Sequence, residues 1–227
     1  MSRPVLLVFV RAPVPGPVKT RLAATVGAER ARRLYRELAA SIWRGLEDPA
    51  WERWLCVEPP GALAEAEAWL PGADRVLGQA RGDLGERLFR AFEEAFRTGA
   101  AAAAAVGSDA PEVEAGRVRR AFADLRQGAG ATLVPSLDGG YALLGLRRAE
   151  DSLFRGVPWS TPGVLEATRS ALRSLGWTWT EQEPVRDLDT EEDLRALERA
   201  GWIPPAGTGE AGPGARGRDG RGKGRPR

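Results

Sequence analysis

Residues 5–22 read VLLVFVRAPVPGPVKTRL, a short apolar run that passes directly into a proline-rich loop. The first six residues are continuously apolar and rich in β-branched side chains, which is typical of a strand buried on both faces. The prolines lower the entropy cost of holding the loop in one shape, and Gly16 lets a ligand approach the backbone closely. Lys19 and Arg21 add positive charge at the far end. The stretch predicts an anion site, most simply for phosphates, with a rigid surface loop as the alternative.

The rest of the chain alternates between strand and helix patterns. Further strands are expected at residues 54–57, 75–77, 102–106, 132–136, 141–146 and 177–183. Helices are expected at residues 28–46, 62–70, 84–97, 116–126, 162–175 and 191–200. This alternation predicts an α/β fold with a mainly parallel central sheet and helices on both faces. Ligands in such folds sit at the carboxyl ends of the strands.

Three local expectations can be checked directly. The alanine run at residues 102–106 favours a helix by propensity, but small residues suit a central strand packed between helices, and we predict a strand. Thr161 is expected to cap the helix that follows it. Thr190 and Asp193 are expected to form a capping box at the start of the last helix.

The composition excludes several classes of chemistry. The 227-residue chain has no histidine and a single cysteine, Cys56. The lack of histidine excludes a Ser-His-Asp triad, a histidine base and a histidine-ligated metal. The single cysteine excludes an internal disulfide and a cysteine-based zinc site. The first apolar run is too short to cross a bilayer, and no small-residue cleavage site follows it. We expect a cytoplasmic protein without a membrane partner.

The formal net charge of +2 is unevenly distributed. Residues 204–227 carry six basic and two acidic residues, so the preceding part of the chain has a net charge of −2. This Gly/Pro/Arg-rich segment cannot form a core and is expected to be a disordered tail after one domain at residues 1–203. It could contact RNA or an acidic surface, but a solvated extension is the simpler interpretation, and we expect no nucleic-acid partner.

Carboxylates gather at the expected strand ends. Asp109 follows the alanine strand, and Asp187 and Asp189 lie two residues apart on an extended segment. Carboxylates that share a site repel each other unless a cation neutralises them, and Mg²⁺ or Mn²⁺ is the usual choice. Such an ion would clamp a diphosphate. A helix cap for Asp109 and a turn for the other two are the structural alternatives.

Two further stretches are candidates for substrate contact. Asp138-Gly139-Gly140 has the composition of a tight hairpin turn. Asp138 could also face the cleft as an acceptor ligand or base, with the glycines leaving space for substrate. Trp159, just before an expected helix, could stack on an acceptor or sugar ring or simply be half-buried.

Five motifs together resemble one known family. They are FVRAPVPGPVKTRL (9–22), VGSDAPEV (106–113), PSLDGGYALLGL (135–146), VPWSTPGVLEATR (157–169) and RDLDTEEDL (186–194). In this order they resemble the bacterial glycosyltransferase-like family associated with radical-SAM and selenodomain proteins, often labelled an arsenosugar-biosynthesis glycosyltransferase. The resemblance covers about residues 4–202. It implies membership of the nucleotide-diphospho-sugar transferase superfamily, whose fold is a Rossmann-like, three-layer sheet of the GT-A type.

The resemblance also implies roles for individual residues. Nucleotide and phosphate binding would involve Arg11, Pro15, Gly16, Lys19, Arg21 and Ser108. Metal binding would involve Asp109, Asp189 and Asp187, with Asp109 and Asp138 as the catalytic candidates. The acceptor side would be formed by Gly139, Gly140, Tyr141, Trp159, Ser160 and Thr161. Two departures from the family pattern are conservative, because Arg11 replaces the usual lysine and Glu191 replaces a common proline in a first helical turn.

Three functions follow as hypotheses. The first is a glycosyltransferase that depends on Mg²⁺ or Mn²⁺ and uses a nucleotide-activated sugar and a small-molecule acceptor. The second is a nucleotidyltransferase that releases pyrophosphate, like the phospholactate guanylyltransferases; the absence of a Gly-Gly-x-Ser-x-Arg-Met-Gly loop favours the first. The third is a non-catalytic nucleotide-binding protein. A homodimer, the donor base, the sugar and the acceptor stay open.

Overall fold

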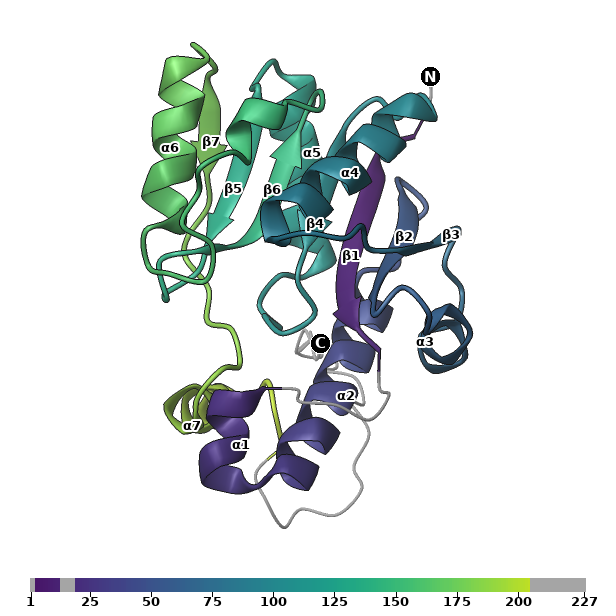
Figure 1. Cartoon of the computed structure of the whole chain (residues 1–227), viewed down its shortest axis with the longest axis vertical. Helices are drawn as coiled ribbons and strands as arrows, with labels where there is room; N and C mark the ends of the chain where they lie inside the picture. Colours follow the sequence, from purple (N-terminus) through teal and green to yellow (C-terminus); the bar gives the residue numbers. More distant parts are fainter. Residues whose placement is uncertain (1–2, 13–18, 205–227) are drawn as a thin grey trace, which may run out of the picture.

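The alternating patterns form one seven-stranded sheet with helices on both faces (Figure 1). The computed structural model describes residues 3–12 and 19–204. The strands lie in the order β3-β2-β1-β4-β6-β5-β7, and only β6 runs antiparallel to its neighbours. The strands are β1 (Val5–Arg11), β2 (Glu52–Glu58), β3 (Arg75–Gly78), β4 (Ala103–Val106), β5 (Ala131–Pro135), β6 (Tyr141–Leu146) and β7 (Trp179–Glu181).

The described residues also form eight helical segments. They are α1 (Thr20–Val26), α2 (Ala28–Gly45), α3 (Leu63–Trp69), α4 (Leu84–Arg97), α5 (Ala115–Arg126), a 3₁₀ turn η1 (Asp151–Leu153), α6 (Val164–Ser174) and α7 (Glu191–Arg199). In Figure 1, α1 and α7 lie beyond one end of the sheet, next to part of α2. None of the described helices is both long enough and apolar enough to span a bilayer.

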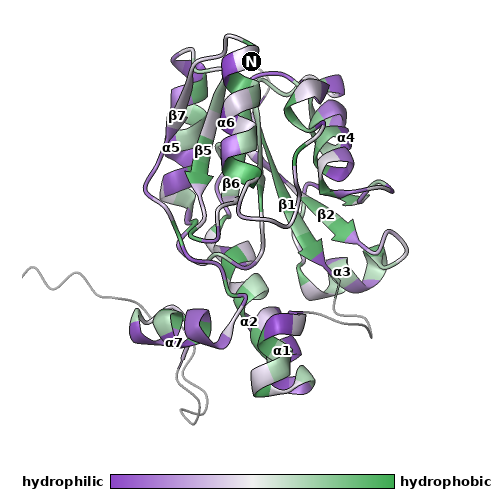
Figure 2. Ribbon diagram, turned by 60° about the vertical axis from the view of Figure 1, so that its left-hand side comes forward, coloured by the Kyte–Doolittle hydropathy of each residue, from purple (hydrophilic) through white to green (hydrophobic). Residues whose placement is uncertain are grey.

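Two apolar layers enclose the sheet because side chains alternate along each strand. Leu6, Val8 and Val10 of β1 pack with helices α2, α3, α5 and α7. Val5 and Leu7 face the other way and pack with α4, η1 and α6. Figure 2 shows the apolar residues concentrated along the central strands, as expected for a sheet covered on both faces. The sequence prediction of fold class is confirmed.

The alanine strand is confirmed at Ala103–Val106, where all four residues are buried. Its neighbour β6 carries Gly145 opposite Ala104. A Cβ atom at Gly145 would lie 3.3 Å from Leu125 Cδ1 of α5, so the sheet and this helix approach closely here. Packing between two layers overrides the helical propensity of alanine.

Two expected boundaries are wrong. The α6 helix begins at Val164 rather than at residue 162, and its N-cap residue is Gly163, without a side-chain cap. The Thr161 hydroxyl instead donates to the Pro158 carbonyl at 2.7 Å and accepts from Gly163 N at 3.2 Å, so it holds the preceding loop together. Strand β7 covers only three of the seven expected residues.

Most other expected elements are confirmed with ends shifted by at most two residues. Helix α1 was not expected from the sequence. It is only seven residues long, and Leu22 is its one buried residue. Such a short helix depends on tertiary packing rather than on its own propensity.

The expected capping box of α7 is confirmed and also holds the segment before the helix. The Asp193 carboxylate accepts from Thr190 N at 2.9 Å and pairs with Arg186 Nη1 at 2.6 Å. It also accepts from Asp189 N at 3.3 Å. Burial raises the pKa of Asp193, but the hydrogen bonds from Thr190 and Arg186 outweigh this and lower it below 3.8.

We expect Asp193→Ala to lower the free energy of unfolding by about 1–2 kcal/mol at neutral pH, through loss of these bonds. Because the pKa of the folded state is lowered, the contribution is fully present above the ordinary pKa and is lost as the pH falls through the lowered value. Urea denaturation between pH 7 and pH 3 measures it, with Glu192→Ala on the exposed face as control. A difference that does not change with pH would contradict this account.

Candidate functional site

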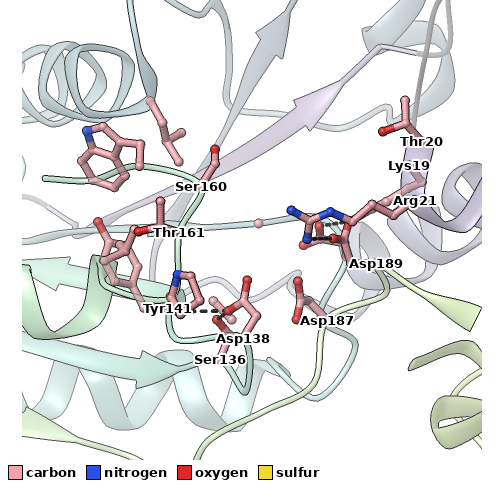
Figure 3. A pocket seen from close by; sticks show the side chains of 18 residues that line it. Lys19, Thr20, Arg21, Ser136, Asp138, Tyr141, Ser160, Thr161, Asp187 and Asp189 are labelled. Atoms are coloured by element: carbon pink, nitrogen blue, oxygen red, sulfur yellow. Dashed lines mark hydrogen bonds and ion pairs between the residues drawn. The ribbon is translucent and has the colours of Figure 1, made fainter. Parts of the chain in front are cut away.

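The carboxyl ends of the parallel strands and the start of β6 meet at one edge of the sheet, and a cavity lies there. Its volume is about 540 Å³. We call it the main cavity (Figure 3). It is lined by Lys19, Thr20, Arg21, Leu84, Gly107, Asp109, Ser136, Asp138, Gly140, Tyr141, Ala142, Trp159, Ser160, Thr161, Pro162, Val164, Asp187 and Asp189.

Cations from the first loop meet carboxylates from distant segments at this edge. Lys19 Nζ lies 2.6 Å from Asp109 Oδ2 and 3.5 Å from Asp189 Oδ1. Arg21 Nη1 lies 2.9 Å from Asp189 Oδ2. The Lys19 side chain is 11% exposed and that of Arg21 69% exposed, so Lys19 is the internal cation of the cluster. The predicted convergence of these charged residues is therefore present.

The backbone explains why the carboxylates are close together. Asp109 follows β4, and its carbonyl accepts a hydrogen bond from Leu188 N at 3.0 Å. This bond docks the segment that carries Asp187 and Asp189 against the end of β4. The capping box of α7 then fixes Asp189 from the other side through Asp193.

The charged groups of the cluster are not equally paired with groups of opposite charge. Burial lowers the pKa of Lys19, but the charge and hydrogen bond of Asp109, together with the charge of Asp189, outweigh this and raise it above its ordinary value. For Asp187, burial and the charges of Asp109 and Asp138 raise the pKa to about 6. Among the described residues, Asp187 forms no ion pair within 4 Å, and Figure 3 shows it beside Asp138.

Asp138 lies in the β5–β6 hairpin, as expected, and one of its oxygens is fixed. Asp138 Oδ1 accepts from the Ser136 hydroxyl and from Gly140 N, the latter at 2.9 Å. Gly139 adopts φ +91°, and its carbonyl accepts from Leu165 N at 2.9 Å. The hairpin is thus attached to the first turn of α6.

The loop before α6 forms another wall of the main cavity. The Trp159 indole packs on Gly85 in the first turn of α4, where a Cβ atom would lie 2.6 Å from Trp159 Nε1. Within the described part of the chain this buried Nε1 has no hydrogen-bond partner. Ser160 adopts the left-handed region with φ +63°. Trp159 is half-buried, which was one of the two interpretations of its sequence position, and it also lines the main cavity.

A smaller neighbouring hollow of about 370 Å³ shares Lys19, Asp109 and Asp189 with the main cavity, and we call it the side cavity. Ser108 and Arg11 line it. The hydroxyl of Tyr35 accepts from Arg11 N at 2.8 Å and lies 3.0 Å from Ser108 Oγ. Burial raises the pKa of Tyr35.

The sequence interpretation missed several residues of the side cavity, among them Tyr35, Gln79 and Arg87. Gln79 directly follows β3, so the strand-end argument could have identified it. Its amide nitrogen donates to the carbonyls of Val10 and Cys56, at 3.3 and 3.0 Å. Tyr35 projects from the middle of a helix, and its pattern gives no comparable signal.

The remaining predicted residues fall into three groups. Pro15 and Gly16 lie outside the described residues. Gly139 does not line either cavity but packs against Pro162. The expected tail, apart from Pro204, also lies outside the described residues. All other predicted site residues line the main or the side cavity.

The described residues contain no group of three or more Cys, Asp or Glu side chains placed to hold a metal ion by themselves. Asp109 and Asp187 nevertheless line the same cavity, and within the described residues Asp187 forms no ion pair closer than 4 Å. Mg²⁺ is usually held by one or two carboxylates together with substrate phosphates, so these two residues fit a shared ion but not a preformed cage.

Solved structures of other proteins share this fold. The chain is 34% identical to a proposed nucleotide-diphospho-sugar transferase from Desulfovibrio desulfuricans G20, covering 88% of each chain with a TM-score of 0.81. Two more distant structures show the fold alone. CMP:2-keto-3-deoxy-manno-octonic acid synthetase, complexed with CTP, is 13% identical over 88% of this chain and 98% of that chain, with a TM-score of 0.54. Rv0371c from Mycobacterium tuberculosis H37Rv, in complex with manganese, is 17% identical over 88% and 100%, with a TM-score of 0.51.

The fold is therefore the Rossmann-like fold of nucleotide-diphospho-sugar transferases, as the sequence resemblance implied. No curated protein matches the sequence. A profile of the DUF2064 family, described as "Uncharacterized protein conserved in bacteria", matches residues 42–161, more than half of the chain. By this match, the chain belongs to the DUF2064 family.

Proposed function

We propose that the protein is a metal-dependent glycosyltransferase that uses a nucleotide-activated sugar and a small-molecule acceptor. One observation carries the proposal: Lys19 and Arg21 lie beside Asp109, Asp187 and Asp189 in a single cavity at the carboxyl ends of parallel strands. Cations and carboxylates so arranged suit a diphosphate bound with a divalent ion. The likeness to the Desulfovibrio protein supports this substrate class.

Lys19 and Arg21 are the residues that would bind the diphosphate. Both now pair with carboxylates, and Arg21 is exposed enough to turn toward a ligand. Lys19 is the less mobile of the two because it is nearly buried between Asp109 and Asp189. The rest of the nucleotide would extend into the side cavity, past Ser108 and Tyr35.

Asp109 and Asp187 are the residues that would hold Mg²⁺ or Mn²⁺. Both oxygens of Asp189 already face cations, Lys19 and Arg21, so this residue is better suited to positioning those side chains. When bound, the ion would neutralise charge that develops on the departing nucleoside diphosphate.

Asp138 is the candidate for binding the acceptor hydroxyl or removing its proton. Ser136 and Gly140 hold its Oδ1, so the carboxylate is fixed in position before a substrate arrives. A fixed carboxylate loses little entropy when it binds a hydroxyl group, which is the general advantage of a preorganised site.

Nucleotide binding is the direct test. A donor present at 100 times its dissociation constant should stabilise the folded protein by about 2.7 kcal/mol. For a chain of this size, that corresponds to a rise in Tm of about 5–10 °C. We expect such a rise in a thermal-shift screen of nucleotide sugars with Mn²⁺, and a much smaller one with EDTA.

Asp109→Asn should remove the Mn²⁺-dependent part of this rise. Asp151→Asn should not, because Asp151 pairs with Arg155 and lines neither cavity. A screen in which no nucleotide raises the Tm would contradict the proposal. Once a ligand is found, the product separates the two reactions, because glycosyl transfer releases a nucleoside diphosphate and nucleotidyl transfer from a nucleoside triphosphate releases pyrophosphate.

A further inference from the structure

The two ends of the main cavity differ in charge. At one end, Lys19 and Arg21 lie among carboxylates from the end of β4 and the segment before α7. The other end, which we call the acceptor wall, consists of Ser136, Asp138, Gly140, Tyr141, Ala142, Trp159, Ser160, Thr161, Pro162 and Val164. Asp138 is the one charged side chain in this set. An anionic group placed there would meet a carboxylate and no cation of the described residues.

The polar groups of the acceptor wall are also largely committed to neighbours. The Ser136 hydroxyl donates to Asp138, and the Thr161 hydroxyl donates to the Pro158 carbonyl at 2.7 Å. The Trp159 N–H is covered by Gly85 of α4 and does not reach the cavity. An anion needs several hydrogen-bond donors to replace its hydration, and this wall has few to offer.

Asp138 offers the opposite chemistry, that of a hydrogen-bond acceptor. Its Oδ1 is held by Ser136 and Gly140, while Oδ2 makes no hydrogen bond within the described residues. A divalent ion between Asp109 and Asp187 would neutralise those two carboxylates and leave the charge of Asp138 uncompensated. The free oxygen of Asp138 is therefore suited to a hydroxyl or ammonium donor.

We infer that the acceptor is a hydroxyl compound without a phosphate or carboxylate near its reacting hydroxyl, either uncharged or carrying an amine. This inference rests on the proposed function, because it assigns the acceptor wall to the second substrate. It also separates the site from transferases whose acceptor is itself a phosphate or carboxylate, since these need cations at this position.

Three probes with the same ring test the inference: glucosamine, glucose and glucuronate carry a positive, a neutral and a negative group. Their binding to the full-length protein is measured by saturation-transfer NMR at pH 7.0 with no nucleotide present. We expect the dissociation constant of glucosamine to be about 5-fold lower than that of glucose, as for one charge pair at about 4 Å in water, and glucuronate to bind most weakly.

Two variants test whether the preference for glucosamine depends on Asp138. Asp138→Asn should abolish the preference for glucosamine over glucose. Glu93→Gln makes the same change in net charge on the exposed surface of α4, where Glu93 pairs with Arg90, and should leave the preference intact. A glucosamine signal no stronger than that of glucuronate, or a preference that persists in Asp138→Asn, overturns the inference. If the nucleotide screen fails but glucosamine is still preferred, the proposed function is contradicted and the preference at Asp138 is not.

Discussion

Gly139→Ala is expected to lower the free energy of unfolding by about 3–5 kcal/mol, because two costs combine at this position. A Cβ atom would clash with the Pro162 carbonyl oxygen and lie 2.7 Å from Pro162 Cα, and backbone atoms cannot move aside like a flexible side chain. Gly139 also has φ +91°, where residues with a side chain are strained. Overpacking costs about 1–3 kcal/mol and backbone strain a similar amount.

The control separates the two costs. Gly156→Ala also introduces a side chain at positive φ, +69°, but no atom lies within 4 Å of the new Cβ. We expect it to cost only the strain, about 1 kcal/mol. Urea denaturation measures both variants. Equal losses would show that the contact between the β5–β6 hairpin and Pro162 is loose, and that Asp138 is not held against the loop before α6.

The strand-end argument succeeded because it depends on chain direction alone. Residues 107–109 and 136–140 directly follow the strands β4 and β5, and residues 187–189 lie beyond β7. Because β4, β5 and β7 run parallel and only β6 is reversed, these three segments reach the same edge of the sheet. Small residues at β4 were equally decisive, because a strand between two helix layers leaves little room for side chains. These features are local in sequence or follow from topology.

The missed features depend on contacts between distant residues. Thr161 does not cap α6, because Leu165 N in the first turn bonds to the Gly139 carbonyl of the hairpin and the helix starts later. Helix α1 is held by the burial of Leu22, a single residue without a periodic pattern. Tyr35 reaches Ser108 from 73 positions away. No pattern within a short window of sequence reports such pairings.

Lys19→Met is expected to destabilise the protein by about 2–4 kcal/mol and to make its stability depend on divalent metal. The substitution keeps the length of the side chain but removes the internal cation at 2.6 Å from Asp109 and 3.5 Å from Asp189. Leaving buried charge unpaired costs about 3–5 kcal/mol, and the 31% exposure of both carboxylates reduces this. A divalent ion could then take the place of the ammonium group.

Thermal unfolding with 5 mM MnCl₂ and with EDTA measures this exchange. The rise in Tm with Mn²⁺ should be larger in Lys19→Met than in the unchanged protein, because the ion no longer competes with a fixed positive charge. Arg21→Met is the matched control: Arg21 is 69% exposed and pairs with Asp189 alone, so its loss should cost about 0–1 kcal/mol. If both variants lose the same stability, Lys19 is not the internal cation of the cluster. If Mn²⁺ affects Lys19→Met no more than the unchanged protein, the carboxylates around Lys19 do not bind a divalent ion, which contradicts the assignment of Asp109 as a metal ligand.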